Sequence, residues 1–322
     1  MRAGHTGVYL LPEDLILLRG KAQQLNLHRK APSRAAMAGT SHTRFRGRGM
    51  EFAEVRPYQA GDDIRTIDWR VTARTQVPHT KLFQEERERP VFILVDQRSP
   101  MFFGSQHCFK SVYAAELAAM IAWACHQGGD RLGGVLLGDH AQQDLRATRG
   151  KPGLLHFLNA LVDYNQRLFS PVPKAKTLPL LPALEQLGQV VKPGSQVFLL
   201  SDFHDLDTAC QESLSRMAKH SDVIALHIFD PLEADIPQGS LLRISNGFKR
   251  LLLSGSDLKV PFNASFRQQQ QHLQTLCGAS QVVFANCPVS ADSLNPLRRL
   301  FADGSHKGAA ALNSLAGALY GR

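Results

Sequence analysis

From Pro90 onward the chain alternates short apolar runs with longer segments of helical periodicity, and this alternation constrains the fold more than any other feature. The apolar runs are VFILVD (91–96), RLGGVLLGD (131–139), SQVFLLSDF (195–203) and DVIALHIFD (222–230). Runs that are apolar throughout are typical of parallel strands covered by helices on both faces. We therefore predict an α/β fold with a doubly wound, mostly parallel sheet.

The patterns divide the chain into three segments. Residues 1–43 are predicted to form an N-terminal helix over 12–28 and a basic linker, and 44–89 a small β-rich segment. Residues 90–322 are predicted to form the α/β domain, with a third strand in QDLRATR and a late hairpin from SLLRISNGF and KRLLLSG.

Composition excludes several classes of protein. Hydrophobic residues make up 43% and charged residues 20% of the 322 residues, which is typical of a folded globular chain. The longest apolar stretch, 114–125, is too short to cross a bilayer and contains Glu116, so we expect no transmembrane segment and a cytoplasmic protein. The five cysteines are scattered without a CxxC pair, which predicts reduced thiols.

The net charge of +9 is concentrated near the N-terminus. Residues 19–48 contain eight Lys or Arg residues and no acid. Such a run could attract nucleic acid, an acidic membrane surface or an acidic protein, or it could be a solvated segment without a ligand.

Polar residues follow the predicted strands at the edge where ligands of doubly wound sheets gather. Asp96 ends the first strand, Asp202 ends the fourth strand, and Thr177 begins a predicted helix. Two carboxylates and a hydroxyl are ligands that Mg²⁺ accepts. The alternative is that each residue caps a helix or holds a turn locally.

Residues 47–96 carry a long ordered set of motifs. These are Glu51, Arg56, Tyr58, GDD at 61–63, IDW at 67–69, Arg74 and EERERP at 85–90. The set resembles the bacterial family called domain of unknown function 58, over roughly residues 40–245. The resemblance implies a von Willebrand factor A-like domain after residue 90, no established enzymatic activity, and association with a MoxR-type AAA+ ATPase and other von Willebrand factor A proteins.

The resemblance also implies a metal-ion-dependent adhesion site, whose first motif is Asp-x-Ser-x-Ser. Asp96 matches the aspartate, but Arg98 and Pro100 stand at the two serine positions, with Ser99 between them. Thr177 and Asp202 match the second and third motifs. The site is therefore degenerate: we expect no cofactor, with Mg²⁺ held by Asp96, Thr177 and Asp202 as the alternative.

Arg98 brings a permanent positive charge to this edge. A guanidinium pairs bidentately with carboxylates, so we expect Arg98 to neutralise Asp96 and Asp202 in place of an ion. The alternative is that Arg98 points to solvent.

Acids and bases also alternate in the signature region. They are Arg56, Asp62, Asp63, Arg65, Asp68, Arg70 and Arg74, with Trp69 among them. They could interlock as a surface network or form a docking face for the ATPase, in which Trp69 would be either a packed anchor or an interface residue.

These observations lead to a non-enzymatic protein-interaction adaptor. The candidate partner-binding residues are Asp96, Arg98, Ser99, Thr177 and Asp202 at the sheet edge, and Arg56, Asp62, Asp63, Asp68 and Trp69 in the signature region. One alternative is nucleic-acid binding through 19–48. A metal-dependent hydrolase centred on Asp96, Asp202 and His204 is a second, which the missing metal ligands disfavour, and no phosphate loop, HExxH helix or GxSxG elbow occurs.

Overall fold

The computed structural model describes residues 7–27, 50–59, 62–85, 89–168, 177–237, 241–245, 250–302, 310 and 312–314. These residues belong to two compact units. One comprises 1–37 together with 89–322, and the other comprises 38–88. Most of the basic run 19–48 and residues 86–88 of the EERERP motif lie outside the described residues.

The larger unit is built on a six-stranded sheet with the order β10-β7-β6-β3-β4-β5. Its strands are β3 (Val91–Asp96), β4 (Arg131–Leu137), β5 (Gln142–Arg149), β6 (Gln196–Ser201), β7 (Asp222–Phe229) and β10 (Val283–Pro288). The neighbours pair in parallel, except that β5 runs antiparallel to β4. The predicted doubly wound, mostly parallel sheet is confirmed.

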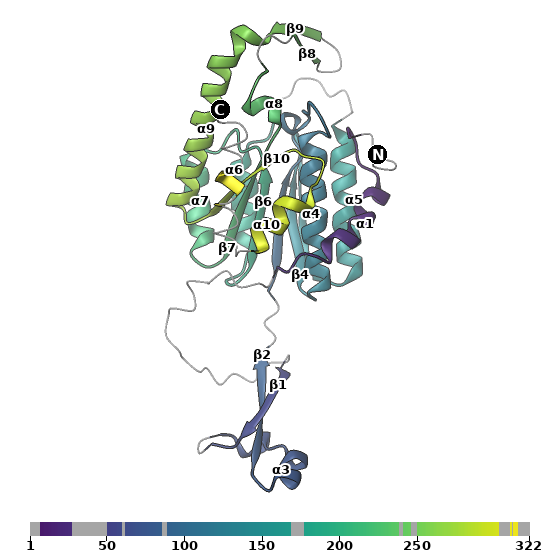
Figure 1. The fold of residues 1–322 in the computed structure, drawn as a ribbon, viewed down its shortest axis with the longest axis vertical. Helices are drawn as coiled ribbons and strands as arrows, with labels where there is room; N and C mark the ends of the chain where they lie inside the picture. Colours follow the sequence, from purple (N-terminus) through teal and green to yellow (C-terminus); the bar gives the residue numbers. More distant parts are fainter. Residues whose placement is uncertain are drawn as a thin grey trace. The chain divides into compact units, whose positions relative to one another are not determined.

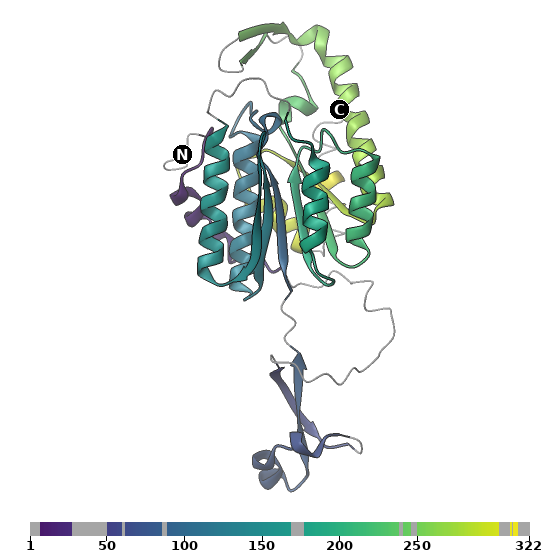
Figure 2. The same ribbon diagram turned by 180° about the vertical axis from the view of Figure 1, so that it is seen from behind.

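Helices cover both faces of this sheet, as Figures 1 and 2 show. On one face, α4 (Lys110–Gln127), α5 (Lys151–Arg167) and α10 (Leu294–Ala302) pack on the sheet. On the other face, α6 (Leu180–Val190), α7 (Thr208–Ala218) and part of α9 (Gly255–Ala279) do so. Alternate residues of β3 enter the two cores, since Ile93 belongs to one and Leu94 to the other.

The N-terminal segment packs on the outside of this unit. The predicted helix over 12–28 consists instead of two short helices, α1 (Pro12–Leu17) and α2 (Arg19–Ala22). Leu15 and Ala22 are fully buried, and the Trp123 indole of α4 donates a hydrogen bond to the Leu15 carbonyl at 2.9 Å. The apolar face of this segment is therefore buried against α4 of the same chain.

The smaller unit contains an antiparallel hairpin of β1 (Met50–Pro57) and β2 (His79–Glu85). Between the strands lie the 3₁₀ turn η2 (Ile64–Thr66) and helix α3 (Trp69–Thr75). The segment 44–89, predicted to be β-rich, is therefore helical over part of its length. The Asp68 carboxylate accepts hydrogen bonds from the backbone N–H groups of Arg70 and Val71, and this N-cap starts a helix.

Further elements lie between β7 and β10 in the chain. They are α8 (Pro231–Ala234), the predicted hairpin, formed by β8 (Leu241–Ser245) and β9 (Arg250–Ser254), and then α9. Within the described residues, no helix is both long and apolar enough to cross a membrane. All five cysteines are buried and unbridged.

Candidate functional site

The strand order places the candidate site at the switch point of the sheet. The chain leaves β3 toward β4 on one side, and it leaves β6 toward β7 on the other, while β3 and β6 are neighbours. Asp96 ends β3, and Ser201 and Asp202 lie at the end of β6. The predicted convergence of Asp96 and Asp202 on one edge is thus what the fold produces.

Arg98 points into the protein and not to solvent. Its side chain is 1% exposed, and it donates five hydrogen bonds, one for each guanidinium N–H. Two reach the Asp96 carboxylate at 2.9 and 2.7 Å, two reach Asp205 at 2.7 and 3.0 Å, and one reaches the Leu178 carbonyl at 2.9 Å. Arg98 therefore clamps two carboxylates bidentately.

The acceptor capacity of Asp96 is used as completely as the donor capacity of Arg98. Besides the two guanidinium bonds, Asp96 accepts the Arg98 backbone N–H at 3.0 Å and the Ser201 hydroxyl at 2.6 Å. Four bonds fill the lone-pair sites of a carboxylate. We call the set of Asp96, Arg98, Ser201 and Asp205 the arginine network.

The arginine network does not fit a magnesium ion. Mg²⁺ requires six oxygen ligands in octahedral geometry, whereas residues 98 and 100 supply no hydroxyl and the Asp96 oxygens are engaged. Within the described part of the chain, no group of three or more His, Cys, Asp or Glu side chains is placed to hold a metal ion.

The partner of Arg98 differs in part from the prediction. Arg98 pairs with Asp96 as predicted, but its second carboxylate is Asp205 and not Asp202. Burial works against the charge of Arg98, yet hydrogen bonds to Asp96 and Asp205 raise its pKa further above the usual value. Burial likewise opposes the ionised form of Asp205, and the Arg98 bonds outweigh it and lower the Asp205 pKa.

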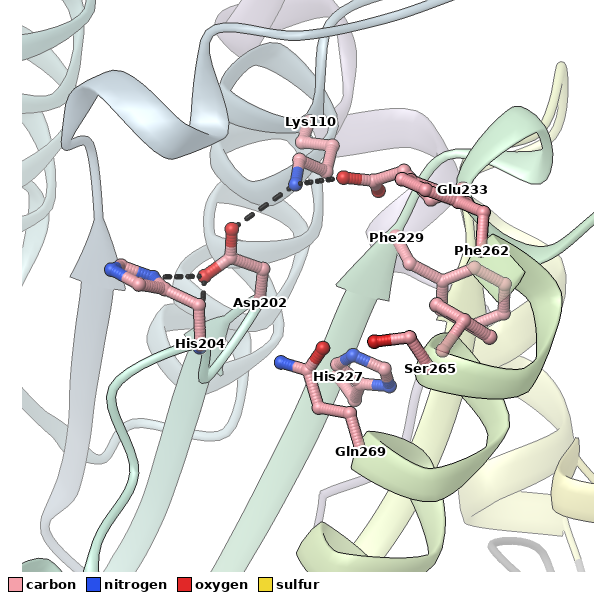
Figure 3. Close-up of a pocket in the computed structure, with 10 residues that line it drawn as sticks. Lys110, Asp202, His204, His227, Phe229, Glu233, Phe262, Ser265 and Gln269 are labelled. Carbon is pink, nitrogen blue, oxygen red and sulfur yellow. Dashed lines mark hydrogen bonds and ion pairs between the residues drawn. The ribbon is translucent and has the colours of Figure 1, made fainter. Parts of the chain in front are cut away.

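A second buried cation neutralises Asp202. Lys110, the first residue of α4, places its ammonium 3.1 Å from Asp202 and 2.8 Å from Glu233 of α8 (Figure 3). Burial lowers the pKa of Lys110, but the two carboxylates outweigh burial and the net shift is upward. We call Lys110, Asp202 and Glu233 the lysine cluster.

His204 stands at the rim of the lysine cluster. Its Nδ1 lies 2.9 Å from Asp202 and 3.9 Å from Asp205, and 38% of its side chain is exposed. The hydrogen bond to Asp202 is the main cause of a raised His204 pKa. The Ser201 hydroxyl donates its hydrogen bond to Asp96 and not to His204. Ser201, Asp202 and His204 therefore do not form a Ser–His–Asp relay.

The two remaining edge candidates lie outside both groups. The Ser99 backbone N–H donates to Asp139 at 2.7 Å, and the Ser99 hydroxyl contacts the same carboxylate. Thr177 is half-buried and lies beside Leu178, the carbonyl acceptor of Arg98. Helix α6 begins only at Leu180, so Thr177 does not start the helix as predicted.

The signature-region candidates have separate local roles. Arg56 pairs with Asp62 at 2.8 Å. Asp63 caps η2 and Asp68 caps α3, and Trp69 is 68% exposed. Asp63 and Asp68 therefore act as local helix caps. The Trp69 ring remains accessible on the smaller unit.

Sequence reasoning missed Lys110, Ser201, Asp205 and Glu233. Asp205 follows Asp202 by three residues in SDFHD, and Lys110 is the only Lys or Arg of a largely apolar helix. A cation at the start of a largely buried helix is a usable signal, because lysine is almost never fully buried unless it is paired.

A family model, a curated relative and solved structures match this chain. The family described as "Protein of unknown function DUF58" matches residues 54–272. Uncharacterized protein Rv1480 of Mycobacterium tuberculosis is 29% identical over 191 residues, covering 59% of this chain and 58% of that protein, so the chain spans little more than half of this curated relative.

Two solved structures resemble the chain at a TM-score of 0.38. An aerotolerance-related membrane protein from Bacteroides fragilis is 14% identical, over 71% of this chain and 99% of that one. The SpRpn10 VWA domain is 13% identical, over 67% of this chain and 97% of that one.

Proposed function

This chain belongs to the DUF58 family of proteins of unknown function, and from that membership and the geometry of the sheet edge we propose that it is a non-enzymatic protein-interaction adaptor. The observation that carries the proposal is the arginine network. An edge whose acids Asp96 and Asp202 are already paired with Arg98 and Lys110 has no need of an ion, and binds through surface contacts alone.

The partner that we propose is a MoxR-type AAA+ ATPase, with other von Willebrand factor A proteins as further members of the assembly. The chain has no nucleotide-binding motif of its own, so energy from ATP would have to come from such a partner. Two surfaces are available for contact: the sheet edge around His204, and the exposed Trp69 of the smaller unit.

Recovery of the tagged protein from its source cells tests this proposal. An AAA+ ATPase should co-purify with the wild type, and Trp69→Ala should reduce its yield at least about fivefold, since exposed aromatic residues are often interface anchors. Leu17→Ala is the matched control, because Leu17 is 71% exposed and belongs to neither surface. Recovery without any ATPase would refute the partnership.

Calorimetric titration tests the absence of a metal. Wild-type protein should release no heat with Mg²⁺ or Mn²⁺, because the Asp96 oxygens are occupied by Arg98 and Ser201. Micromolar binding of either ion would show that the network opens and that the edge is a metal site after all.

A further inference from the structure

The lysine cluster borders a cavity of about 190 Å³ between α9 and the carboxyl ends of β6 and β7. Unlike the arginine network, its hydrogen-bonding groups are not all used. An ammonium has three N–H donors, and within the described residues Lys110 finds two acceptors, Asp202 and Glu233. The Lys110 side chain is 3% exposed and lines the cavity, so its third donor is left for a ligand. A ligand that supplies an oxygen acceptor removes the cost of that unmet donor.

Acceptors are available beside this donor. His227 is buried and its Nδ1 lies 3.0 Å from the Asn286 amide oxygen. An amide oxygen can only accept, so Nδ1 carries the proton and Nε2 is left as an acceptor. Burial lowers the His227 pKa to about 4, which keeps the ring neutral at neutral pH. The cavity therefore combines one unused donor with acceptors on His227, Asp202 and Glu233.

The charge and the unused donor of the cluster disfavour anionic and cationic ligands for two different reasons. Asp202 and Glu233 against Lys110 leave one net negative charge when His204 is neutral. A carboxylate ligand would add a second negative charge in a partly buried site. An ammonium or guanidinium ligand would place a cation beside Lys110 and offer it no acceptor. A neutral amide matches both needs, because its carbonyl accepts and its NH₂ donates.

The walls and the volume of the cavity fit a small, flat group. Phe262, Ser265, Phe266 and Gln269 line the cavity from one face of α9, at helical spacing, and Phe229 lines it from β7 (Figure 3). A volume of about 190 Å³ is below the roughly 300–1,000 Å³ of sites for drug-sized ligands. It suits one side chain.

The α9 wall is tied to the two residues that follow α8. Asn263 donates to the Asp235 carboxylate at 2.8 Å and accepts the Ile236 N–H at 3.3 Å, and Lys259 pairs with Asp235 at 3.3 Å. These contacts hold Phe262 and Gln269 over the cavity before any ligand arrives, which lowers the entropic cost of binding.

We propose that this cavity binds a neutral primary amide, the side chain of a glutamine or asparagine presented by a partner protein. The presentation by a partner rests on the proposed adaptor function, whereas recognition of the amide rests on the cavity alone.

Titration of the full ¹⁵N-labelled chain with three small probes tests the proposal. Propanamide should shift the backbone signals of Ser265 and Gln269 saturably at millimolar concentration. Propionate and propylammonium, of similar size, should bind at least about tenfold more weakly, because propionate adds a negative charge to the site and propylammonium offers the third Lys110 donor no acceptor. Equal binding by either charged probe, or no saturable shift with propanamide, would overturn the proposal.

Two variants sharpen the test. Gln269→Leu should weaken propanamide binding at least about fivefold, whereas the matched change Gln268→Leu, on the neighbouring exposed residue, should not. Glu233→Gln removes the net negative charge and should raise propionate affinity at least about tenfold relative to propanamide. Equal effects of the two glutamine variants, or unchanged selectivity in Glu233→Gln, would contradict the cavity assignment.

The proposed partner can be refuted without refuting amide binding by the cavity. If propanamide binds as expected while the recovered AAA+ ATPase is unaffected by Gln269→Leu, the cavity stands and the presentation of the amide by that partner is refuted.

Discussion

At the scale of single residues, Arg98 shows how a charge can be buried without an ion. Burying a guanidinium is costly, and here five hydrogen bonds and two carboxylates offset the cost. Removing one partner of such a set leaves the others as uncompensated buried charges. Arg98 is therefore expected to matter more for stability than any exposed arginine.

Arg98→Met should lower the free energy of unfolding by about 3–5 kcal/mol, because Asp96 would remain buried without its cation. Urea denaturation monitored by circular dichroism measures the change. The control is Arg299→Met, on an exposed position of α10, which should alter the free energy by less than about 0.5 kcal/mol. Equal effects of the two variants would show that the arginine network adds no stability.

Replacing both Arg98 and Pro100 by serine should create magnesium binding. The double change removes the competing cation and supplies two hydroxyl ligands next to Asp96, which Mg²⁺ accepts. Calorimetry should detect heat with Mg²⁺ in this variant. The double change to alanine removes the cation without adding ligands, and similar heat from the alanine variant would refute the role of the hydroxyls.

At the scale of elements, the turn between β6 and α7 distributes the charges. It follows Ser201, the last residue of β6, and carries Asp202 and Asp205. Its Phe203 is buried with φ of 52°, in the left-handed region that is rare for non-glycine residues. Asp202 reaches the lysine cluster and Asp205 reaches Arg98. Two acids that are only three residues apart thus belong to two different ion pairs.

His227 of strand β7 should make the free energy of unfolding depend on pH. Its folded pKa of about 4 lies below the ordinary value of about 6.5, so the unfolded chain takes up a proton first as pH falls. Stability from His227 is complete above pH about 6.5 and is lost toward pH 4, by about 3 kcal/mol. His227→Phe should lack this loss, as denaturation at pH 7 and pH 4.5 would show. A parallel decline in both proteins would contradict the assignment.

His204 acts in the opposite direction and provides the control. Its pKa is raised by Asp202, so its contribution is complete below pH about 6.5 and is lost as pH rises above that value. Since the ring is 38% exposed, the effect should be small. The charges that face His227 are Asp202 and Lys110, which shift its pKa in opposite directions, so burial dominates.

At the scale of the whole molecule, the smaller unit is an insertion. Residues 38–88 form one compact unit, and the chain on both sides of them contributes to the other. The N-terminal helices pack on α4, so the larger unit holds its two segments together by burial, at Leu15 and Ala22 among others. The two units should therefore be separable.

Replacing residues 38–88 with a short glycine-serine linker should leave the larger unit folded, because its core lies within 1–37 and 89–322. The shortened protein should unfold cooperatively and bind propanamide as the full chain does, while recovery of the ATPase should fall as it does in Trp69→Ala. Loss of cooperative unfolding would show that the units depend on each other.

Much of the fold was predictable because burial on both faces leaves a readable pattern. The strands after residue 90, their covering helices and the late hairpin follow from apolar runs and helical spacing. The errors fell where local capping or tertiary packing decides. The Asp68 cap starts α3 within a segment that was predicted to be β-rich. The segment 12–28 forms two short helices that are defined by burial against α4 and not by periodicity alone.

The succession of strands after residue 90, the edge that carries Asp96, and the loss of two hydroxyl ligands to Arg98 and Pro100 could all be read from the sequence. Only the tertiary structure decided how the charges pair. Asp205 lies 107 residues from its partner Arg98, and Lys110 lies 92 residues from its partner Asp202. Which carboxylate meets which cation depends on distances between the ends of β3, β6, α4 and α8. Ion pairing falls off with distance in space, and spacing along the chain does not report that distance.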